Sequence, residues 1–410
     1  MTKSLSLSLL GGLMAIWGCQ TASPDAPSLE EQADQLAHKF IIADGHVDLP
    51  YRMRVRNFRL EKEYLDVSKR TEGGDFDFVR AQEGGLDAPF MSIYIPAKHQ
   101  ETPGRSAEVA DSLIDLVEGV AERYPEQFAV ATSPAEVQEA FAAGKVALPM
   151  GMENGSPLES IELVQHFYDR GVRYVTLTHS KDNLICDSSY DTTRTHNGLS
   201  AYGEEVVKEM NRVGIMVDIS HVSDSAFFDV LAMTDVPMIA SHSSCRYFTP
   251  GFERNMNDDM LKALAEKDGV IMINFGSTFI DSTSQQFYNS MRAEMADWMR
   301  ENKVQWGDSA YDAKVEEYKE THGGGFSSVH VVADHIQHVV EVAGIDHVGF
   351  GSDFDGVGDT LPTGLKDVAD YPNLIAELLR RGFTPEDIEK IASGNLFRVW
   401  NAVQAASAGA

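Results

Sequence analysis

Phe40-Ile41-Ile42-Ala43-Asp44-Gly45-His46-Val47-Asp48 is a short apolar run whose last residues are polar and able to bind a metal. Five further runs follow the same pattern and end in a histidine or a carboxylate: 146–153, 174–179, 215–221, 237–242 and 347–353. Each run is typical of a buried strand that turns polar at its carboxyl end. Parallel strands joined by helices bring these ends to one rim. We therefore expect the imidazoles and carboxylates to converge there.

Two more apolar runs, 90–96 and 270–275, complete a set of eight expected strands. Helical patterns lie between most of them, such as the apolar spacing in 106–124 and the helix start at Ser133-Pro134-Ala135-Glu136. Alternating strands and helices indicate a parallel barrel or a doubly wound sheet. An open sheet concentrates its site at one switch point, whereas here the polar residues end many strands. The sequence therefore predicts an α/β fold, a (β/α)8 TIM barrel.

One segment interrupts this alternation. Residues 281–328 contain two polar helical patterns followed by Gly323-Gly324-Gly325. We interpret this segment as a helical insertion beside the barrel. The predicted barrel domain, insertion included, covers residues 36–405.

The amino-terminal residues have the composition of an export signal. Lys3 precedes an apolar stretch, 5–17, that is too short to span a bilayer and ends just before Cys19. The pattern predicts a signal peptide of the lipoprotein type at 1–18 and a polar tether at 19–35. The protein would then be exported, as a periplasmic or membrane-anchored lipoprotein of a bacterium. An ordinary cleaved signal with an incidental cysteine is the alternative.

The net charge and the cysteines limit which ligands and binding partners we expect. The chain has 410 residues, with 63 acidic against 34 basic side chains and a formal net charge of −29. Such a surface repels phosphate backbones, so we expect no nucleic acid partner. Cys186 and Cys245 do not lie in a Cys-x-x-Cys motif, which argues against a thiolate zinc site, and the sequence leaves their bonding open. A homodimer is also left open.

Five residues at the strand ends are candidate metal ligands. His46 and Asp48 lie on the same side of one strand because side chains alternate. Glu153 follows an apolar run where a carboxylate is costly to bury without a partner, and His221 and His242 end successive strands. Each alone could be an incidental polar or structural residue. Five ligands are more than one tetrahedral site with an open position needs, so they fit two metals that share a carboxylate. Such a pair of metals can hold a bridging hydroxide and polarise a carbonyl.

This arrangement resembles the membrane dipeptidase (renal dipeptidase) family of zinc metallopeptidases, which have an amidohydrolase-type barrel. The resemblance extends from Ile42 to Val403, and its most specific pieces are Asp44–Asp48, Leu177–His179, Asp218–Ser223, Ser241–Ser244 and Gly351–Gly356. It implies that His46 and Asp48 bind one Zn²⁺, that His221 and His242 bind the other, and that Glu153 bridges the two ions.

The resemblance implies three further roles. His179 matches a residue that contacts the substrate and stabilises charge, Arg254 matches the arginine that meets the substrate's carboxylate, and Asp353 matches the proton-transfer carboxylate. Each role is physically reasonable, as an oxyanion donor, a planar fork for a carboxylate and a general base. Each role also has an alternative. His179 could be a further metal ligand, and Asp355 could act in place of Asp353. Arg254 could be a surface loop residue, with Arg246 binding the carboxylate instead.

These observations lead to one functional hypothesis and two alternatives. We expect a zinc-dependent dipeptidase in which a hydroxide bridging the metals attacks the peptide bond of a dipeptide. A related two-metal barrel hydrolase acting on a lactam, lactone or cyclic imide is the first alternative. A non-catalytic lipoprotein that binds a peptide or metal is the second. The segment Gly276-Ser277-Thr278-Phe279 stands where a tyrosine hydroxyl is expected in animal relatives, so the preferred side chains of the substrate stay open.

Overall fold

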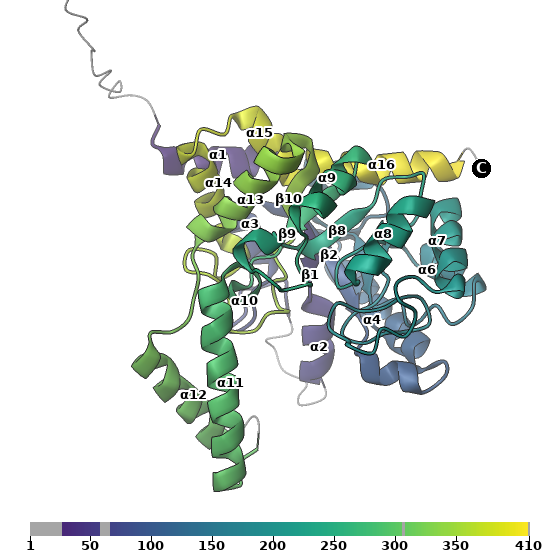
Figure 1. Ribbon diagram of the computed structural model, residues 1–410. Coiled ribbons are helices and arrows are strands. Elements are labelled where there is room, and N and C mark those ends of the chain that lie inside the picture. The colour runs from purple at the N-terminus through teal and green to yellow at the C-terminus, as the bar shows by residue number, and fades with distance from the viewer. Residues whose placement is uncertain (1–26, 58–65, 306–307, 409–410) are drawn as a thin grey trace, which may run out of the picture.

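A closed barrel of parallel strands forms the centre of the protein (Figure 1). The computed structural model describes residues 27–57, 66–305 and 308–408. Within these ranges eight strands pair in the order β1-β10-β9-β8-β7-β6-β5-β2. They are β1 (Ile42–Val47), β2 (Leu86–Tyr94), β5 (Met150–Glu153), β6 (Val172–Thr176), β7 (Met216–Asp218), β8 (Ile239–Ser243), β9 (Val270–Ile273) and β10 (Val348–Phe350). The predicted (β/α)8 barrel is confirmed.

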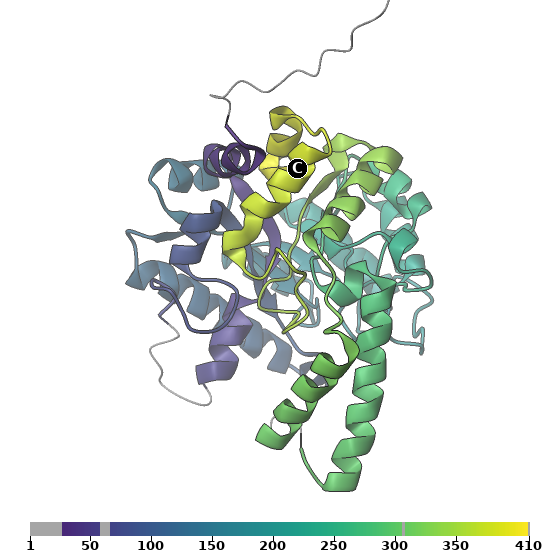
Figure 2. The same cartoon turned by 90° about the vertical axis from the view of Figure 1, so that its left-hand side faces the viewer.

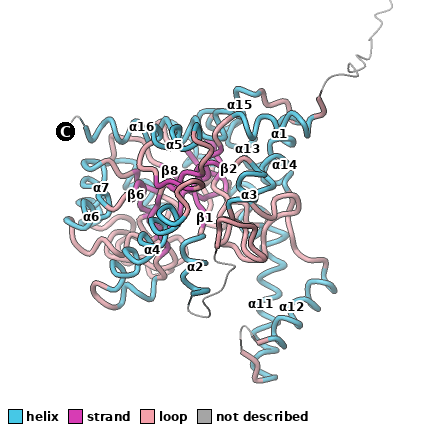
Figure 3. Tube along the Cα trace, turned by 180° about the vertical axis from the view of Figure 1, so that it is seen from behind, coloured by secondary structure: helices cyan, strands magenta, loops and turns pink. Residues whose placement is uncertain are grey.

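Helices surround the barrel (Figure 3). They are α1 (Leu29–Lys39), α2 (Leu49–Asn57), α3 (Phe78–Gly84), α4 (Arg105–Arg123), α5 (Pro134–Ala142), α6 (Glu162–Asp169), α7 (Ala201–Val213), α8 (Asp224–Met233), α9 (Asp258–Glu266), α10 (Ser277–Ile280), α11 (Ser282–Asn302), α12 (Ser309–His322), α13 (Val329–Ala343), α14 (Tyr371–Arg380), α15 (Pro385–Glu389) and α16 (Asn395–Ala408). Short 3-10 segments lie at Ala97–Glu101, Arg246–Phe248, Ile345–His347 and Val368–Asp370, and a π-helical turn at Lys390–Gly394 joins α15 to α16.

The inside of the barrel is filled by side chains that point inward from alternate strand positions. Phe90 and Tyr174 are fully buried there with their rings 5.3 Å apart. Trp400 of α16 packs on Phe90 at 5.1 Å and belongs to the same apolar cluster. The barrel is therefore a packed core rather than a pore, and its functional groups can gather only at a rim.

The predicted strand 146–153 is divided in two by Pro149. Val146–Leu148 is strand β4, which pairs outside the barrel with β3 (Phe128–Val130), and only Met150–Glu153 joins the barrel as β5. Proline has no N–H to donate, so it interrupts a ladder of hydrogen bonds. Its carbonyl still accepts a hydrogen bond from Met91 N at 2.7 Å, which keeps the carboxyl end of the segment in the barrel.

The folded part of the chain begins earlier than expected. Ser28 and Glu31 form a capping box that starts α1, and this helix buries Ala33, Leu36 and Ala37. Residues 29–35, which the predicted bounds place in the tether at 19–35, therefore belong to a packed helix.

The predicted signal peptide at 1–18 and the lipidation site Cys19 lie outside the described residues. Among the helices that are described, none has both the length and the apolar character needed to cross a membrane. Cys186 and Cys245 are buried free thiols.

Helices α11 and α12 form a hairpin that extends from the barrel on the same side as α2 (Figures 1 and 2). They lie within the insertion expected at about 281–328. The hairpin has its own small core, made by Tyr288, Met291, Met295 and Tyr318. Since α2 directly follows the carboxyl end of β1, the hairpin stands at the rim where the strands' polar ends meet.

Candidate active site

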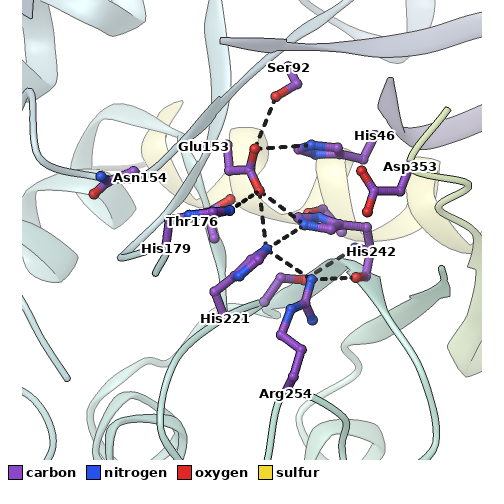
Figure 4. A network of polar contacts seen from close by, with 12 residues as sticks. His46, Ser92, Glu153, Asn154, Thr176, His179, His221, His242, Arg254 and Asp353 are labelled. Carbon is purple, nitrogen blue, oxygen red and sulfur yellow. Dashed lines mark hydrogen bonds and ion pairs between the residues drawn. The ribbon is translucent and has the colours of Figure 1, made fainter. Parts of the chain in front are cut away.

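The predicted metal ligands converge at the carboxyl ends of their strands: His46, His221 and His242 surround Glu153 (Figure 4), and Asp48 lies beside His46. The Nε2 atoms of His221 and His242 lie 3.1 and 3.2 Å from Glu153 Oε1. His46 Nε2 lies 3.4 Å from the other oxygen, Oε2. Asp48 Oδ2 is 3.5 Å from His46 Nε2. The carboxylate of Glu153 thus presents one oxygen to each of two sets of side chains.

The donor atoms are close enough to share cations. In the described part of the chain, three groups of residues have ligand atoms within 4.8 Å of one another: His46, Glu153 and His242; Glu153, His179 and His221; and His46, Asp48 and Asp353. Glu153 belongs to two of these groups. The spacing therefore fits metal binding on both sides of its carboxylate.

The electrostatics of the cluster also fit bound cations. Burial lowers the pKa of His221 and of His242 well below the ordinary value, so both rings stay neutral and keep a lone pair. Burial acts against a charge on His46 too, but Tyr174, Glu153 and Asp48 outweigh it and raise its pKa well above the ordinary value. This side of the cluster favours positive charge.

Two buried polar atoms without hydrogen-bond partners also indicate a metal site. Among the residues that the structure describes, His46 Nε2 and Asp48 Oδ1 have no hydrogen-bond partner. Buried polar atoms are costly to leave unsatisfied, and a metal ion satisfies both an imidazole nitrogen and a carboxylate oxygen. The side chains present therefore fit a divalent metal.

Tyr174 fixes the orientation of the His46 ring. Its hydroxyl donates to the carbonyl of Gly45 at 2.9 Å and lies 2.8 Å from His46 Nδ1. Because the hydroxyl hydrogen is used on Gly45, the oxygen accepts the Nδ1 proton of His46. Nε2 is then the ring nitrogen that faces Glu153, and it is the atom that a metal would bind in place of its proton.

Ser241 and Asp218 fix the orientation of the His242 ring in a similar way. Ser241 Oγ donates to Asp218 Oδ2 at 2.6 Å and lies 2.7 Å from His242 Nδ1, whose proton it accepts. Asp218 is buried and is held by the backbone N–H groups of Ser220 and Ser241 at 3.0 and 2.8 Å. The Nε2 lone pair of His242 is again left facing Glu153.

Sequence reasoning did not identify Tyr174, Ser241 and Asp218 as supporting residues. The available signal was a polar side chain inside each apolar run, because a buried hydroxyl or carboxylate needs a partner.

Asp353 faces the metal-ligand cluster (Figure 4), whereas Asp355 is held by Asp75 and Arg52 at the side of the cavity. Asp353 Oδ2 accepts a hydrogen bond from Asn274 Nδ2 at 2.8 Å. Asp355 and Asp75 instead exchange two hydrogen bonds of 2.7 Å between side chain and backbone. A Cβ on Gly356 would lie 2.2 Å from oxygens of both Asp353 and Asp48, so only glycine lets this loop pass so close to the carboxylates. Burial, together with the charges of Asp48 and Glu153, raises the pKa of Asp353 well above the ordinary value.

His179 lies at the edge of the cluster, next to solvent. Its Nε2 is 3.5 Å from Glu153 Oε1, and 19 % of its side chain is exposed. Burial lowers its pKa, so the ring is neutral. This position suits either a substrate contact or a further ligand, so the role of His179 stays a prediction.

Arg254 is buried against the cluster. Its Nη2 donates to the carbonyl of His242 at 2.7 Å and to His221 Nε2 at 3.0 Å. Arg246, the neighbouring candidate, is bound to both carboxylate oxygens of Asp224 at 2.6 and 2.7 Å. The structure thus brings Arg254 rather than Arg246 to the cluster, and its contact with a substrate carboxylate stays a prediction.

A cavity of about 910 Å³ opens over these residues. Its lining includes five of the predicted site residues: Asp48, Glu153, His179, His221 and Asp353. A closed (β/α)8 barrel that gathers imidazoles and carboxylates at the floor of a cavity is the arrangement of a metal-dependent hydrolase.

Comparisons with known proteins place this hydrolase in a family. The model of the membrane dipeptidase family (peptidase family M19) matches residues 30–410, and the chain belongs to this family. It is a metallo-dipeptidase, a hydrolase of peptide bonds. The reading as a non-catalytic lipoprotein is therefore set aside.

Two relatives and two solved structures illustrate the similarity. An uncharacterized dipeptidase of Schizosaccharomyces pombe is 31 % identical and covers 92 % of this chain and 84 % of its own length. Dipeptidase verJ of Clonostachys rogersoniana is 34 % identical, with 89 % and 85 % covered. The probable dipeptidase PvdM of Pseudomonas aeruginosa superposes with a TM-score of 0.79 at 25 % identity, over 92 % of this chain and 99 % of that one. A metallopeptidase of Rhodobacter sphaeroides has the same fold, with a TM-score of 0.70 at 23 % identity, over 89 % and 99 %.

Proposed function

We propose that the protein is a zinc-dependent dipeptidase whose two Zn²⁺ ions are bridged by Glu153. His46 and Asp48 would hold one ion, and His221 and His242 the other. The observation that carries this proposal is the position of the Glu153 carboxylate, with one oxygen 3.4 Å from His46 and the other 3.1 Å from His221. Imidazole and carboxylate ligands with an open position are typical of catalytic zinc.

The side chains around the cluster divide the remaining work. A bound Zn²⁺ would supply the Lewis acidity needed to activate a water and to polarise the amide carbonyl. Asp353 accepts the proton of the attacking water and passes it to the departing amine, a role that its position beside His46 and Asp48 supports. His179 faces the cavity with a neutral ring and donates a hydrogen bond to the oxyanion.

Arg254 would bind the free carboxylate of the substrate. Its terminal nitrogens already donate to Ser243 Oγ at 2.6 Å and to the carbonyl of His242 at 2.7 Å. Its Nε has no partner among the described residues, so this N–H is available to a carboxylate. A carboxylate so close to the reacting amide would limit the substrates to very short peptides.

The test is turnover of a dipeptide panel by the purified protein before and after removal of metal by a chelator. The panel includes L-Ala-D-Ala, because the Rhodobacter sphaeroides metallopeptidase was crystallised with a phosphinate mimic of that dipeptide. We expect hydrolysis that is lost on chelation and restored by Zn²⁺. Full activity without metal would overturn the proposal, and turnover of a lactam or lactone without dipeptide turnover would favour the other two-metal hydrolase.

We also propose that the protein is exported and anchored to a membrane through a lipid on Cys19. The proposal rests on the basic, apolar and small-residue pattern of residues 1–19. In a bacterial host, Cys19→Ser should move the protein from the membrane fraction to the soluble fraction. An unchanged distribution would argue for an ordinary cleaved signal.

A further inference from the structure

Helix α11 supplies one wall of the cavity over the metal cluster. Gln285, Asn289 and Arg292 all line this cavity. They are spaced by four and three residues, so they share one face of the helix. A second face of the helix packs on α12 through Tyr288, Met291 and Met295. The hairpin is thus oriented with a polar face toward the cavity.

The hairpin is attached to the barrel by specific contacts. Tyr288 Oη donates to the carbonyl of Asp359 at 2.9 Å, and Lys319 of α12 is paired with the carboxylate of Asp359. Gln285 Nε2 donates to the carbonyl of Thr278 at 3.4 Å. These contacts join the hairpin to α10 and to the loop that carries Asp359. The polar face is therefore held in position without a bound ligand.

The charge on this wall is opposite to that of the floor. Of the described residues that line the cavity, Arg292 is the single lysine or arginine, while the carboxylates Asp48, Glu153, Asp353 and Asp355 line it as well. Arg292 is exposed and has no ion pair with any residue in the described ranges. Arg300, two turns further along the same helix, is paired with Asp297 at 2.6 Å. Arg292 is thus a guanidinium left available to a ligand.

The size of the cavity leaves room for such a contact. Its volume of about 910 Å³ lies near the upper end of the range of about 300 to 1,000 Å³ that is typical of pockets for drug-sized ligands. A dipeptide backbone with small side chains is much smaller than such a ligand. A larger side chain can therefore extend from the metal cluster toward α11.

We propose that Arg292, with Asn289 beside it, forms a subsite for an acidic side chain of the substrate. Dipeptides that contain Asp or Glu are then preferred over those with the corresponding amide. A carboxylate matches both the charge and the planar fork of a guanidinium. This inference rests on the proposed dipeptidase function, and it is separate from Arg254, which is 3 % exposed and buried against His221.

The experiment compares kcat/KM for isosteric pairs of dipeptides, Ala-Glu with Ala-Gln and Glu-Ala with Gln-Ala, using Ala-Ala as the reference. We expect the wild-type protein to prefer one acidic dipeptide over its amide partner. Arg292→Gln should lower kcat/KM for that dipeptide about three- to tenfold, and Arg292→Glu should lower it further. Both variants should keep the wild-type values for Ala-Ala and for the amide dipeptides within about twofold.

Arg300→Gln is the matched control, because it removes a guanidinium from the same helix outside the cavity lining. Its kinetics should equal those of the wild type on every substrate. Added salt should reduce the acidic preference of the wild type and leave Arg292→Gln unaffected, since the contact lies near solvent.

Three outcomes would overturn the subsite. They are no preference for acidic dipeptides in the wild type, an equal loss on all dipeptides in Arg292→Gln, and the same loss in Arg300→Gln. Turnover of Ala-Ala by the wild type reports separately on the proposed function. If the wild type hydrolyses no dipeptide at all, both proposals are wrong. If it hydrolyses dipeptides but shows no preference for acidic ones, only the subsite is wrong.

Discussion

Removing the hydroxyl of Tyr174 should weaken metal binding without changing a single ligand. In Tyr174→Phe, the Nδ1 proton of His46 loses the acceptor that now lies 2.8 Å away, and the carbonyl of Gly45 loses a donor at 2.9 Å. The ring of His46 is then free to rotate or to change its tautomer. Rotation turns Nε2 away from Glu153, and the other tautomer places a proton on Nε2, so both changes weaken metal binding.

The expected effect has two parts, one on metal affinity and one on stability. Partners that orient a metal-bound histidine are typically worth about 10- to 100-fold in metal affinity, or about 1.4 to 2.8 kcal/mol. The two lost hydrogen bonds should also lower the free energy of unfolding by about 1 to 3 kcal/mol. Tyr174 is fully buried, so solvent cannot replace either hydrogen bond.

The assay is competition for Zn²⁺ with a chromogenic chelator, together with unfolding by denaturant in the absence of metal. Tyr202→Phe is the matched control: its hydroxyl donates to the carbonyl of Leu158 at 2.8 Å and contacts no predicted ligand. The control should lose some stability and keep its zinc affinity. Unchanged zinc affinity in Tyr174→Phe, or an equal loss in both variants, would refute the role of Tyr174 in orienting His46.

Three further variants test other parts of the site and the fold. Glu153→Gln should lower the zinc content below two ions per chain and reduce turnover by at least about a hundredfold, because a neutral amide cannot bridge two cations as a carboxylate does; metal analysis beside kinetics checks this. Asp353→Asn should reduce kcat about 10²- to 10⁴-fold while the zinc content is kept, and a loss of metal instead would show that Asp353 is mainly a ligand. Burial raises the pKa of Asp87 to about 7 in the folded protein, whereas the value in the unfolded chain is about 3.9. Folding is therefore not penalised at this residue below about pH 4, and the free energy of unfolding falls as the pH rises toward 7. Asp87→Asn keeps an acceptor for Ile42 N, so it should gain stability relative to the wild type by a few kcal/mol at pH 8 and little at pH 4, which denaturant unfolding at the two pH values measures.

The sequence predicts the barrel and the meeting of the ligands for a simple geometric reason. Side chains alternate along a strand, and parallel strands share one carboxyl rim. His46 and Asp48 therefore point to the same side of β1, and the ends of β5, β7 and β8 lie near them without any further information.

The supporting contacts could not be predicted in the same way. Tyr174 orients His46, although the two residues are 128 positions apart in the chain. Arg52 of α2 lies 3.1 Å from the carboxylate of Asp355, which is far away in the sequence. Such pairs depend on the register and twist of the closed barrel, which no local pattern specifies. The split of run 146–153 was predictable in part, since Pro149 cannot donate to a ladder.

The direction of the α11 hairpin was likewise outside the reach of sequence reasoning. Its apolar residues predict a packed face, and that face exists in Tyr288, Met291 and Met295. The pattern does not say toward which side the polar face turns. That depends on the attachment to Asp359 in a loop 71 residues away.

The most direct test of the central claim is X-ray diffraction from zinc-loaded crystals on both sides of the zinc absorption edge. We expect two anomalous peaks, one on each side of the Glu153 carboxylate: one beside His46 and Asp48, the other beside His221 and His242. A single peak, or peaks that do not contact Glu153, would contradict it.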